Sequence, residues 1–295
     1  MRVSSASSLT PSATVATEAP MPMHGDHDDF GDRMKAYEAM ETARVLDRDV
    51  PIYARIDGRS FSSFAHGMRR PFDLRMTAAM VGTMKHLVGE THARIGYTQS
   101  DEISLVWSCD SPERQPLFGG KVHKLTSVLA SMAAASFASE IRLAFEPEVS
   151  ERLLAALPHF DCRVFSLPSK TEAANALLWR AMDARKNAVS MATRSVYSAK
   201  QMHGKDQSAM RAMLADKGIE FEDYPASFKW GTWARRVTFD RGFTAEELAR
   251  IPEKHRPPPD SVVARSEVRT IAMPEFHRVS NRVAVVFDGA SPLIN

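Results

Sequence analysis

Two aspartates of this chain stand where their carboxylates could share metal ions. Asp57 follows the short apolar segment of residues 51–56 and precedes Gly58, so we expect it at the end of a strand. Asp101 lies in a polar bend between two further apolar segments. Phosphoryl and nucleotidyl transfer needs hard cations held by a few carboxylates, with positions left open for phosphate and hydroxyl oxygens. Asp57 and Asp101 are therefore predicted to be catalytic residues that hold two hard metal cations.

The surrounding elements predict how these aspartates meet. Apolar periodicity predicts helices and strands in the order β-α-β-β-α-β, with strands over residues 51–56, 93–97, 103–107 and 162–167 and helices over residues 73–89 and 121–145. This order is the ferredoxin-like arrangement, which is also the core of polymerase palm domains. The predicted fold class is thus α+β. Because the first strand lies next to the hairpin in this arrangement, both carboxylates are expected at one end of the sheet.

Glu102 adjoins Asp101, and alternation along a strand would send its side chain to the opposite face. We expect it to support catalysis, either behind the metal ligands or in contact with a nucleotide. An Asp before Gly is also typical of a plain turn, and Asp-Glu in a hairpin of a solvated bend. The matched positions of the two aspartates in this topology favour the metal site.

Composition sets limits on the class of protein. The 295 residues suffice for one or two domains, and 44% apolar with 25% charged residues is ordinary for a globular protein. No run of eighteen apolar residues is present, which excludes a membrane span. Cys109 and Cys162 have no zinc-like spacing. They are expected to be free thiols in a reducing cytosol, and the location expected is cytoplasmic.

Three regions are expected along the chain. Residues 1–29, rich in Ser, Thr, Ala and Pro at their start, should form a disordered N-terminal arm. Residues 30–168 should form the palm-like catalytic domain, and a first helix is expected over its residues 32–45. Residues 169–295 should form a basic helical and C-terminal extension packed on the palm. Its residues 179–218 carry eight Lys and Arg against three Asp, and residues 282–287 read as a short strand.

Two motifs resemble the signature of the tRNA-His guanylyltransferase family of 3′–5′ RNA polymerases. The first is Arg-Ile-Asp-Gly-Arg-Ser-Phe at residues 55–61, and the second is Gln-Ser-Asp-Glu at residues 99–102. Either motif alone is weak, but together, with 44 residues from Asp57 to Asp101, they are highly specific. The resemblance continues through residues 160–164 and 229–232 and covers about residues 30–237.

The resemblance implies a palm enzyme that adds nucleotides, typically from GTP, to the 5′ end of tRNA. It implies Mg²⁺ at Asp57, Asp101 and the Gly58 carbonyl, ATP as a further nucleotide substrate, and a homotetramer. Clustered cations would neutralise the triphosphate. The positions implied for nucleotide binding are Arg55, Gly58, Arg59, Ser60, Phe61, Ser100, Lys121 and Lys124.

The positions implied for tRNA binding are Arg185, Lys186, Asn187 and Lys229, although exposed basic residues are equally typical of a solvated surface. The eukaryotic enzymes of the family carry a His-Ile-Asn-Asn-Leu-Tyr-Asn run that supports recognition of tRNA-His. Here the matching residues keep the Asn at position 187 and little else, and Ser62 replaces a His. These departures indicate the tRNA-His guanylyltransferase-like branch, which repairs 5′-truncated tRNAs.

Two other classes of function stay open from the residues. A palm-type nucleotide cyclase would release a cyclic nucleotide without RNA. A non-catalytic tRNA-binding protein could keep the same fold, but it would need neither both carboxylates nor the phosphate-binding cations.

Overall fold

The computed structural model describes residues 29–110, 115–258 and 260–294. The chain divides into two compact units, one ending at Glu41 and one spanning Thr42–Asn295. The first unit contains α1 (Asp29–Thr42), which begins three residues before the predicted helix. Apart from Asp29, the predicted disordered arm lies outside the described residues. Among the helices described, no stretch has the length and apolar character needed to cross a bilayer.

The second unit contains the predicted β-α-β-β-α-β order. Its strands and long helices are β1 (Ile52–Gly58), α3 (Leu74–Thr91), β2 (Ile95–Gln99), β3 (Glu102–Trp107), α4 (Val122–Ala144) and β4 (Phe160–Ser166). Short helices α2 (Phe61–Phe64), η1 (Leu117–Gly120) and α5 (Pro147–Ala155) join them. The strands lie in the spatial order β4-β1-β3-β2, and every pair is antiparallel. The predicted ferredoxin-like palm fold is therefore confirmed.

The same sheet continues into the second half of the chain, which the sequence did not predict. Strand β5 (Thr232–Gly242) pairs with β2, and β6 (Val262–Ile271) pairs with β5, giving six strands in one sheet. Beyond Ala234, buried residues give way to alternating half-buried and exposed ones in β5. Because charged side chains occupy many of these positions, the apolar signal of a strand is weak.

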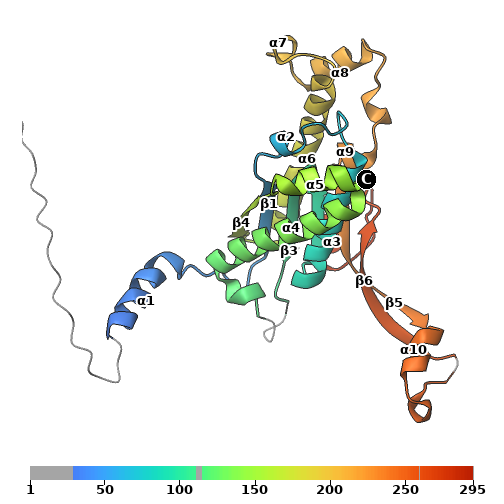
Figure 1. The fold of residues 1–295 in the computed structure, drawn as a ribbon. Helices are drawn as coiled ribbons and strands as arrows, with labels where there is room; N and C mark the ends of the chain where they lie inside the picture. The colour runs from blue at the N-terminus through green and yellow to red at the C-terminus, as the bar shows by residue number, and fades with distance from the viewer. Residues whose placement is uncertain (1–28, 111–114, 259, 295) are drawn as a thin grey trace, which may run out of the picture. The chain divides into compact units, whose positions relative to one another are not determined.

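Helices cover both faces of the sheet. Ile52, Ala54 and Ile56 of β1 point into a core with α3 and α4, which lie side by side in Figure 1. Tyr53 points to the other face, where α6 (Lys170–Arg194) packs. Alternation along β1 thus divides the interior into two layers.

The second face is completed by elements near the C-terminus. These are η4 (Phe276–Arg278) and α11 (Arg282–Phe287), and both contact α6. The prediction of a strand over residues 282–287 was wrong, because this apolar run is a helical turn with Val285, Val286 and Phe287 buried together. A short apolar run fits a buried helix as well as a strand.

Helix α6 can approach the sheet closely because it buries a row of small residues, among them Ala173, Ala174, Ala181, Ala184 and Ala188. The Ser169 side chain caps its start by accepting a hydrogen bond from the Glu172 amide. After α6 come the short helices α7 (Ala199–Met202), α8 (Gln207–Ala215), η2 (Phe221–Asp223) and α9 (Ala226–Lys229), while α10 (Ala245–Arg250) and η3 (Glu253–His255) lie between β5 and β6.

Candidate active site

The sheet brings Asp57 and Asp101 to the same end. Asp57 is the last but one residue of β1 and pairs in register with Glu102, the first residue of β3. Asp101 lies in the turn between β2 and β3. The Gly58 amide donates a hydrogen bond of 3.1 Å to the Asp101 carbonyl. This bond joins the turn that carries one carboxylate to the strand that carries the other.

Left-handed backbone shapes both turns of the site. Ser100, with φ 55°, precedes Asp101 and donates its hydroxyl to Asp101 Oδ1 at 2.9 Å. Ser60, with φ 57°, starts α2 directly after the β1 turn. A residue other than glycine costs about 1–2 kcal/mol in this conformation. The surrounding packing must therefore hold the two turns in place, as is common where strain serves a site.

Two cavities meet at the carboxylates. The larger, about 590 Å³, opens towards α2 and the start of α3 and is lined by Gly58, Ser60, Arg69 and Arg70 among others. The smaller, about 380 Å³, opens towards α6 and is lined by Glu102, Arg180, Asn187 and Ser190 among others. Their shared lining residues are Asp57, Gln99, Ser100, Asp101, Met191 and Arg194. Both aspartates are thus accessible from either cavity.

The surroundings of the two aspartates raise the pKa of each carboxyl group. Burial, followed by the negative charges of Asp101 and Glu102, raises the pKa of Asp57 to about 6, and Arg55 offsets this only weakly. Burial also raises the pKa of Asp101. Carboxylates with raised pKa values in a cavity are candidates for function, because a bound cation would relieve their repulsion.

The donor set fits magnesium. Among the described residues there is no group of three or more His, Cys, Asp or Glu that could hold a metal alone. Two carboxylates with backbone oxygens nearby supply only part of an octahedral shell. Mg²⁺ is commonly bound in this way, since it keeps water and takes phosphate oxygens as its remaining ligands. Asp57, Asp101 and the Gly58 carbonyl are therefore the candidate ligands.

Glu102 begins β3, directly after the turn that holds Asp101. Asp101 is in the turn rather than the strand, and Glu102 pairs directly with Asp57, so these two residues share one face. The Glu102 carboxylate accepts two hydrogen bonds from Arg180, 2.6 Å from Nε and 2.7 Å from Nη2. Arg55 Nε lies 3.9 Å from it. With its oxygens held by Arg180, Glu102 acts here as a fixed link between β3 and α6.

Most of the implied nucleotide-binding residues surround the two carboxylates. Ser60, Phe61 and Ser100 line the larger cavity together with Gly58. Arg59 lines a neighbouring cavity of about 250 Å³. Phe61 is buried and packs on Phe64, Phe137 and Phe160, so its ring belongs to the core beneath the site.

Lys121 and Lys124 are not brought to this end of the sheet. They lie at the start of α4, which follows β3, and β3 runs away from Asp101. Lys121 forms a β-bridge with Val45, and the Lys124 ammonium lies 5.4 Å from the centre of the Phe118 ring. Helix α4 begins near the end of β3 that lies farthest from Asp101, and both lysines are therefore separated from the carboxylates.

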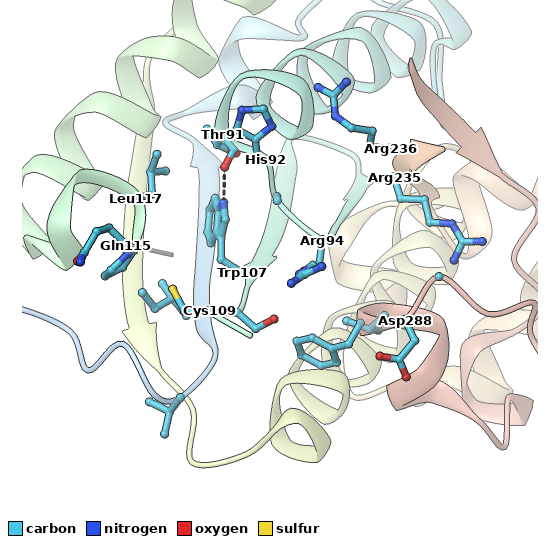
Figure 2. A pocket seen from close by; sticks show the side chains of 18 of the residues that line it. Thr91, His92, Arg94, Trp107, Cys109, Gln115, Leu117, Arg235, Arg236 and Asp288 are labelled. Carbon is cyan, nitrogen blue, oxygen red and sulfur yellow. Dashed lines mark hydrogen bonds between the residues drawn. The ribbon is translucent and has the colours of Figure 1, made fainter. Parts of the chain in front are cut away.

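A cavity of about 770 Å³ lies at that far end (Figure 2). It is lined by Trp107, which ends β3 and pairs with Ile52 at the start of β1. Trp107 donates a hydrogen bond of 3.0 Å to the Thr91 carbonyl. Two arginines of β5 line it, but Arg235 is bonded to the carbonyls of Val285 and Ala290 and Arg236 to that of Gly89. These guanidinium groups serve as caps for helix ends.

The implied tRNA-binding residues divide into two groups. Arg185 and Lys229 are largely buried and bind Glu222, with distances of 2.5 Å and 3.1 Å to its carboxylate oxygens. The Arg185 guanidinium also stacks 4.3 Å from the centre of the Trp230 ring. Both cationic side chains are thus paired with groups of the protein itself. Lys186 and Asn187 are exposed, and Asn187 lines the smaller cavity.

The structure adds residues that the sequence did not single out. Arg69 and Arg70 line the larger cavity, Arg180 the smaller one, and Arg194 lines both. Arg180 and Arg194 were counted only as members of a basic segment. Nothing in the sequence could reveal that Arg180 meets Glu102, which lies 78 residues earlier.

Comparisons with known proteins give the family. A profile described as tRNAHis guanylyltransferase matches residues 31–168. A bacterial tRNA(His) guanylyltransferase-like protein, solved in complex with ATP, is 33% identical; the match covers 70% of this chain and 88% of that one, with a TM-score of 0.64. A structure of such a bacterial protein in complex with GTP is 29% identical, covering 85% and 94% of the two chains, also with a TM-score of 0.64.

A relative from a fungus carries the name of the same family. The tRNA(His) guanylyltransferase of Neurospora crassa is 29% identical over an alignment of 202 residues, and the match covers 61% of this chain and 64% of that protein. The resemblance carried by the two motifs is confirmed. The chain belongs to the tRNAHis guanylyltransferase family and is a nucleotidyltransferase.

Proposed function

We propose that this protein adds nucleotides to the 5′ end of tRNA in the 3′–5′ direction, with GTP favoured. The observation that carries the proposal is the meeting of Asp57 and Asp101 at the junction of two cavities. The bacterial relatives in complex with ATP and GTP support nucleoside triphosphates as substrates. Two Mg²⁺ held by Asp57, Asp101 and the Gly58 carbonyl fit the donor set.

The reaction forms one phosphodiester bond. The 3′-hydroxyl of the incoming nucleotide attacks the activated 5′ phosphorus of the tRNA, and its proton passes to solvent. Pyrophosphate leaves if the tRNA carries a triphosphate, and AMP leaves if a monophosphate end was first adenylylated by ATP. Bound Mg²⁺ would lower the pKa of the attacking hydroxyl and stabilise the leaving group.

The chain's own residues hold this reaction in place. Asp57 and Asp101 supply the negative charge that positions the cations, and Arg69 and Arg70 supply positive charge for phosphates in the larger cavity. Glu102, held by Arg180, fixes α6 beside the site. As part of the same proposal, the altered stretch at residues 185–191 favours 5′-truncated tRNAs over tRNA-His alone. The protein would act as a homotetramer in the cytoplasm.

The test is nucleotide addition to a 5′-truncated tRNA with radiolabelled GTP and Mg²⁺. Asp57→Asn and Asp101→Asn should each lower the rate at least about 1,000-fold while tRNA binding stays near normal. The matched control is Asp161→Asn, which removes a half-exposed carboxylate paired in register with Asp57. This variant should keep most of the activity.

Three results would contradict the proposal. Full activity of either Asp57→Asn or Asp101→Asn would contradict the assignment of these residues as metal ligands. A small cyclic product from GTP without RNA would identify a cyclase. Binding of tRNA that survives chelation, with no addition under any condition, would identify a non-catalytic binding protein.

A further inference from the structure

Trp179 is exposed beside the site although a tryptophan is usually covered. It lies on α6 and keeps 55% of its surface exposed, whereas Trp107 and Trp233 keep 8% and 3%. Helix α6 faces the sheet with its alanines, so its packing does not need an indole at this position. A large exposed aromatic ring indicates a contact surface.

Two arginines hold the indole ring. The Arg180 guanidinium carbon lies 4.6 Å from the ring centre and that of Arg55 lies 5.7 Å from it. Both arginines also reach Glu102, so β1, β3 and α6 contribute to one cluster. The cations fix the ring while leaving more than half of the residue exposed. Such a pre-ordered aromatic surface loses little entropy when a ligand stacks on it.

Arg55, whose guanidinium carbon lies 5.7 Å from the ring centre, connects the ring to the strand that carries Asp57. Arg55 is two residues before Asp57 on β1, so both side chains point to the same face, about 7 Å apart along the strand. Arg163 of β4 is paired in register with Arg55 and therefore shares this face. Its side chain is 54% exposed, and the Asp161 carboxylate, 3.6 Å away, is equally exposed. Such a weak pair leaves Arg163 able to contact a phosphate.

We propose that Trp179 is the stacking platform for an unpaired nucleobase at the acceptor end of the RNA, with Arg163 contacting the adjoining phosphate. This inference rests on the proposed function and places its RNA on the α6 side of the carboxylates. Every nucleobase has a flat face that stacks on an aromatic ring, and phosphates prefer cations. Both elements of single-strand recognition are present beside Asp57.

The first experiment measures equilibrium binding of a 5′-truncated tRNA to the full chain in the absence of nucleotide. Trp179→Ala should weaken binding about 5- to 100-fold, because a stacked base is lost. Trp179→Phe should stay within about 3-fold, since a ring remains. Met182→Ala is the matched control: Met182 is 45% exposed, lies one turn further along α6, and should not matter. Unchanged melting temperatures confirm that each variant is folded.

The second measurement is intrinsic fluorescence. Binding of tRNA should quench the wild-type signal, and Trp179→Phe should lose this quenching because the exposed fluorophore is gone. Arg163→Gln should lower the slope of log affinity against log salt by about one, as expected for one phosphate contact.

Several outcomes would overturn the inference. If Trp179→Ala binds tRNA with wild-type affinity, no nucleobase stacks on Trp179. A raised KM for GTP with unchanged tRNA affinity assigns the ring to the nucleotide instead. Equal losses in Trp179→Ala and Met182→Ala, with altered sedimentation, identify an interface between copies of the chain. If the wild-type protein binds tRNA through Trp179 but adds no nucleotide, the proposed function fails and the platform stands.

Discussion

At the scale of single residues, Asp73 shows how one carboxylate organises the loop that leads to the larger cavity. It caps α3 by accepting hydrogen bonds from the amides of Arg75, at 3.0 Å, and Arg69, at 3.2 Å. The Arg75 guanidinium adds two more. Burial alone would raise the pKa of Asp73, but these bonds outweigh it and lower the pKa to about 2.

This pKa predicts a pH-dependent stability. An Asp with an unfolded pKa of 3.8 and a folded pKa of about 2 stabilises the protein by about 2 kcal/mol above pH 4. The contribution is lost as the pH falls from about 4 to about 2. Urea unfolding of Asp73→Asn should therefore show a deficit of about 2 kcal/mol at pH 6 that shrinks towards pH 3. A deficit that is the same at both pH values would contradict the assignment.

At the scale of elements, the joint between β2 and β5 depends on Gly231. Its φ is +78°, and a Cβ there would lie 2.6 Å from the Thr98 carbonyl oxygen. Thr98 is two residues before Ser100, and the side-chain amide of the neighbouring Gln99 donates a hydrogen bond of 2.9 Å from Nε2 to the Phe228 carbonyl. The close approach at Gly231 thus helps to hold the hairpin that carries Asp101.

Gly231→Ala should destabilise the protein by at least about 2 kcal/mol, because strain from the positive φ adds to the backbone clash. The matched variant is Gly218→Ala, at φ +70° with no atom near the added methyl group. It should cost only about 1 kcal/mol. Chemical denaturation of both variants separates the two effects, and equal losses would rule out the clash.

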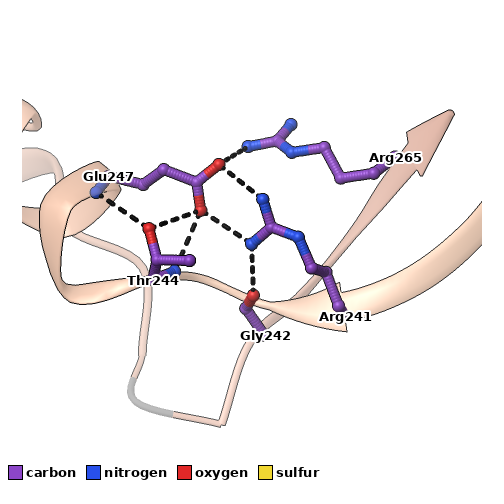
Figure 3. A network of polar contacts seen from close by, with 5 residues as sticks. All are labelled: Arg241, Gly242, Thr244, Glu247 and Arg265. Atoms are coloured by element: carbon purple, nitrogen blue, oxygen red, sulfur yellow. Dashed lines mark hydrogen bonds and ion pairs between the residues drawn. The ribbon is translucent and has the colours of Figure 1, made fainter. Parts of the chain in front are cut away.

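The distal end of the β5–β6 hairpin is fixed by Glu247 (Figure 3). Its carboxylate binds Arg241 of β5 and Arg265 of β6, at 2.8 Å and 2.9 Å. It also closes a capping box with Thr244 at the start of α10. One side chain therefore joins both strands to the helix between them.

Removal of this carboxylate should loosen α10 and the adjoining tip of the β5–β6 hairpin. In Glu247→Ala, amides of α10 should exchange with deuterium faster while those of β1 and β3 stay as in the wild type. Glu246→Ala is the control, because its partner Arg250 lies on the same helix and both side chains are exposed. Faster exchange across the whole sheet would show that the hairpin supports the palm rather than only its own tip.

The elements also show what the sequence could predict. Apolar residues of β1 to β4 and of α3 and α4 recur with clear periods because each has one buried face, and these elements were predicted nearly in full. The helix predicted over residues 73–89 starts at Asp73, which is the N-cap of α3. Strands β5 and β6 were missed because they leave the covered part of the sheet, so their charged residues hide the pattern.

At the scale of the whole molecule, one face of the palm strands is buried by elements from the second half of the chain. Tyr53, Tyr97 and Val106 of the palm strands pack against α6 and the C-terminal elements. The bond between Arg180 and Glu102 crosses the same boundary. The motifs predicted that Asp57 and Asp101 meet at one end of the sheet, but contacts of this kind depend on side chains distant in sequence.

We therefore expect the fragment of residues 30–168 to be unable to fold on its own, since its second core layer would be exposed. The fragment of residues 42–295 should unfold in one transition, within about 2 °C of the full chain, because it contains the whole second unit. Thermal unfolding followed by circular dichroism compares them. A cooperative transition in the shorter fragment would show that the palm is an independent domain.

The hydrogen bond from Gln99 to Phe228 spans 129 residues, which has a consequence for how the enzyme matures during translation. The ribosome releases Asp57 and Asp101 long before β5 exists to pair with β2. Contacts between distant segments form slowly, because the entropy of closing a long loop opposes them. The growing chain should therefore lack this support for the β2–β3 turn until α9 and β5 emerge, and we expect activity only after both have been synthesised.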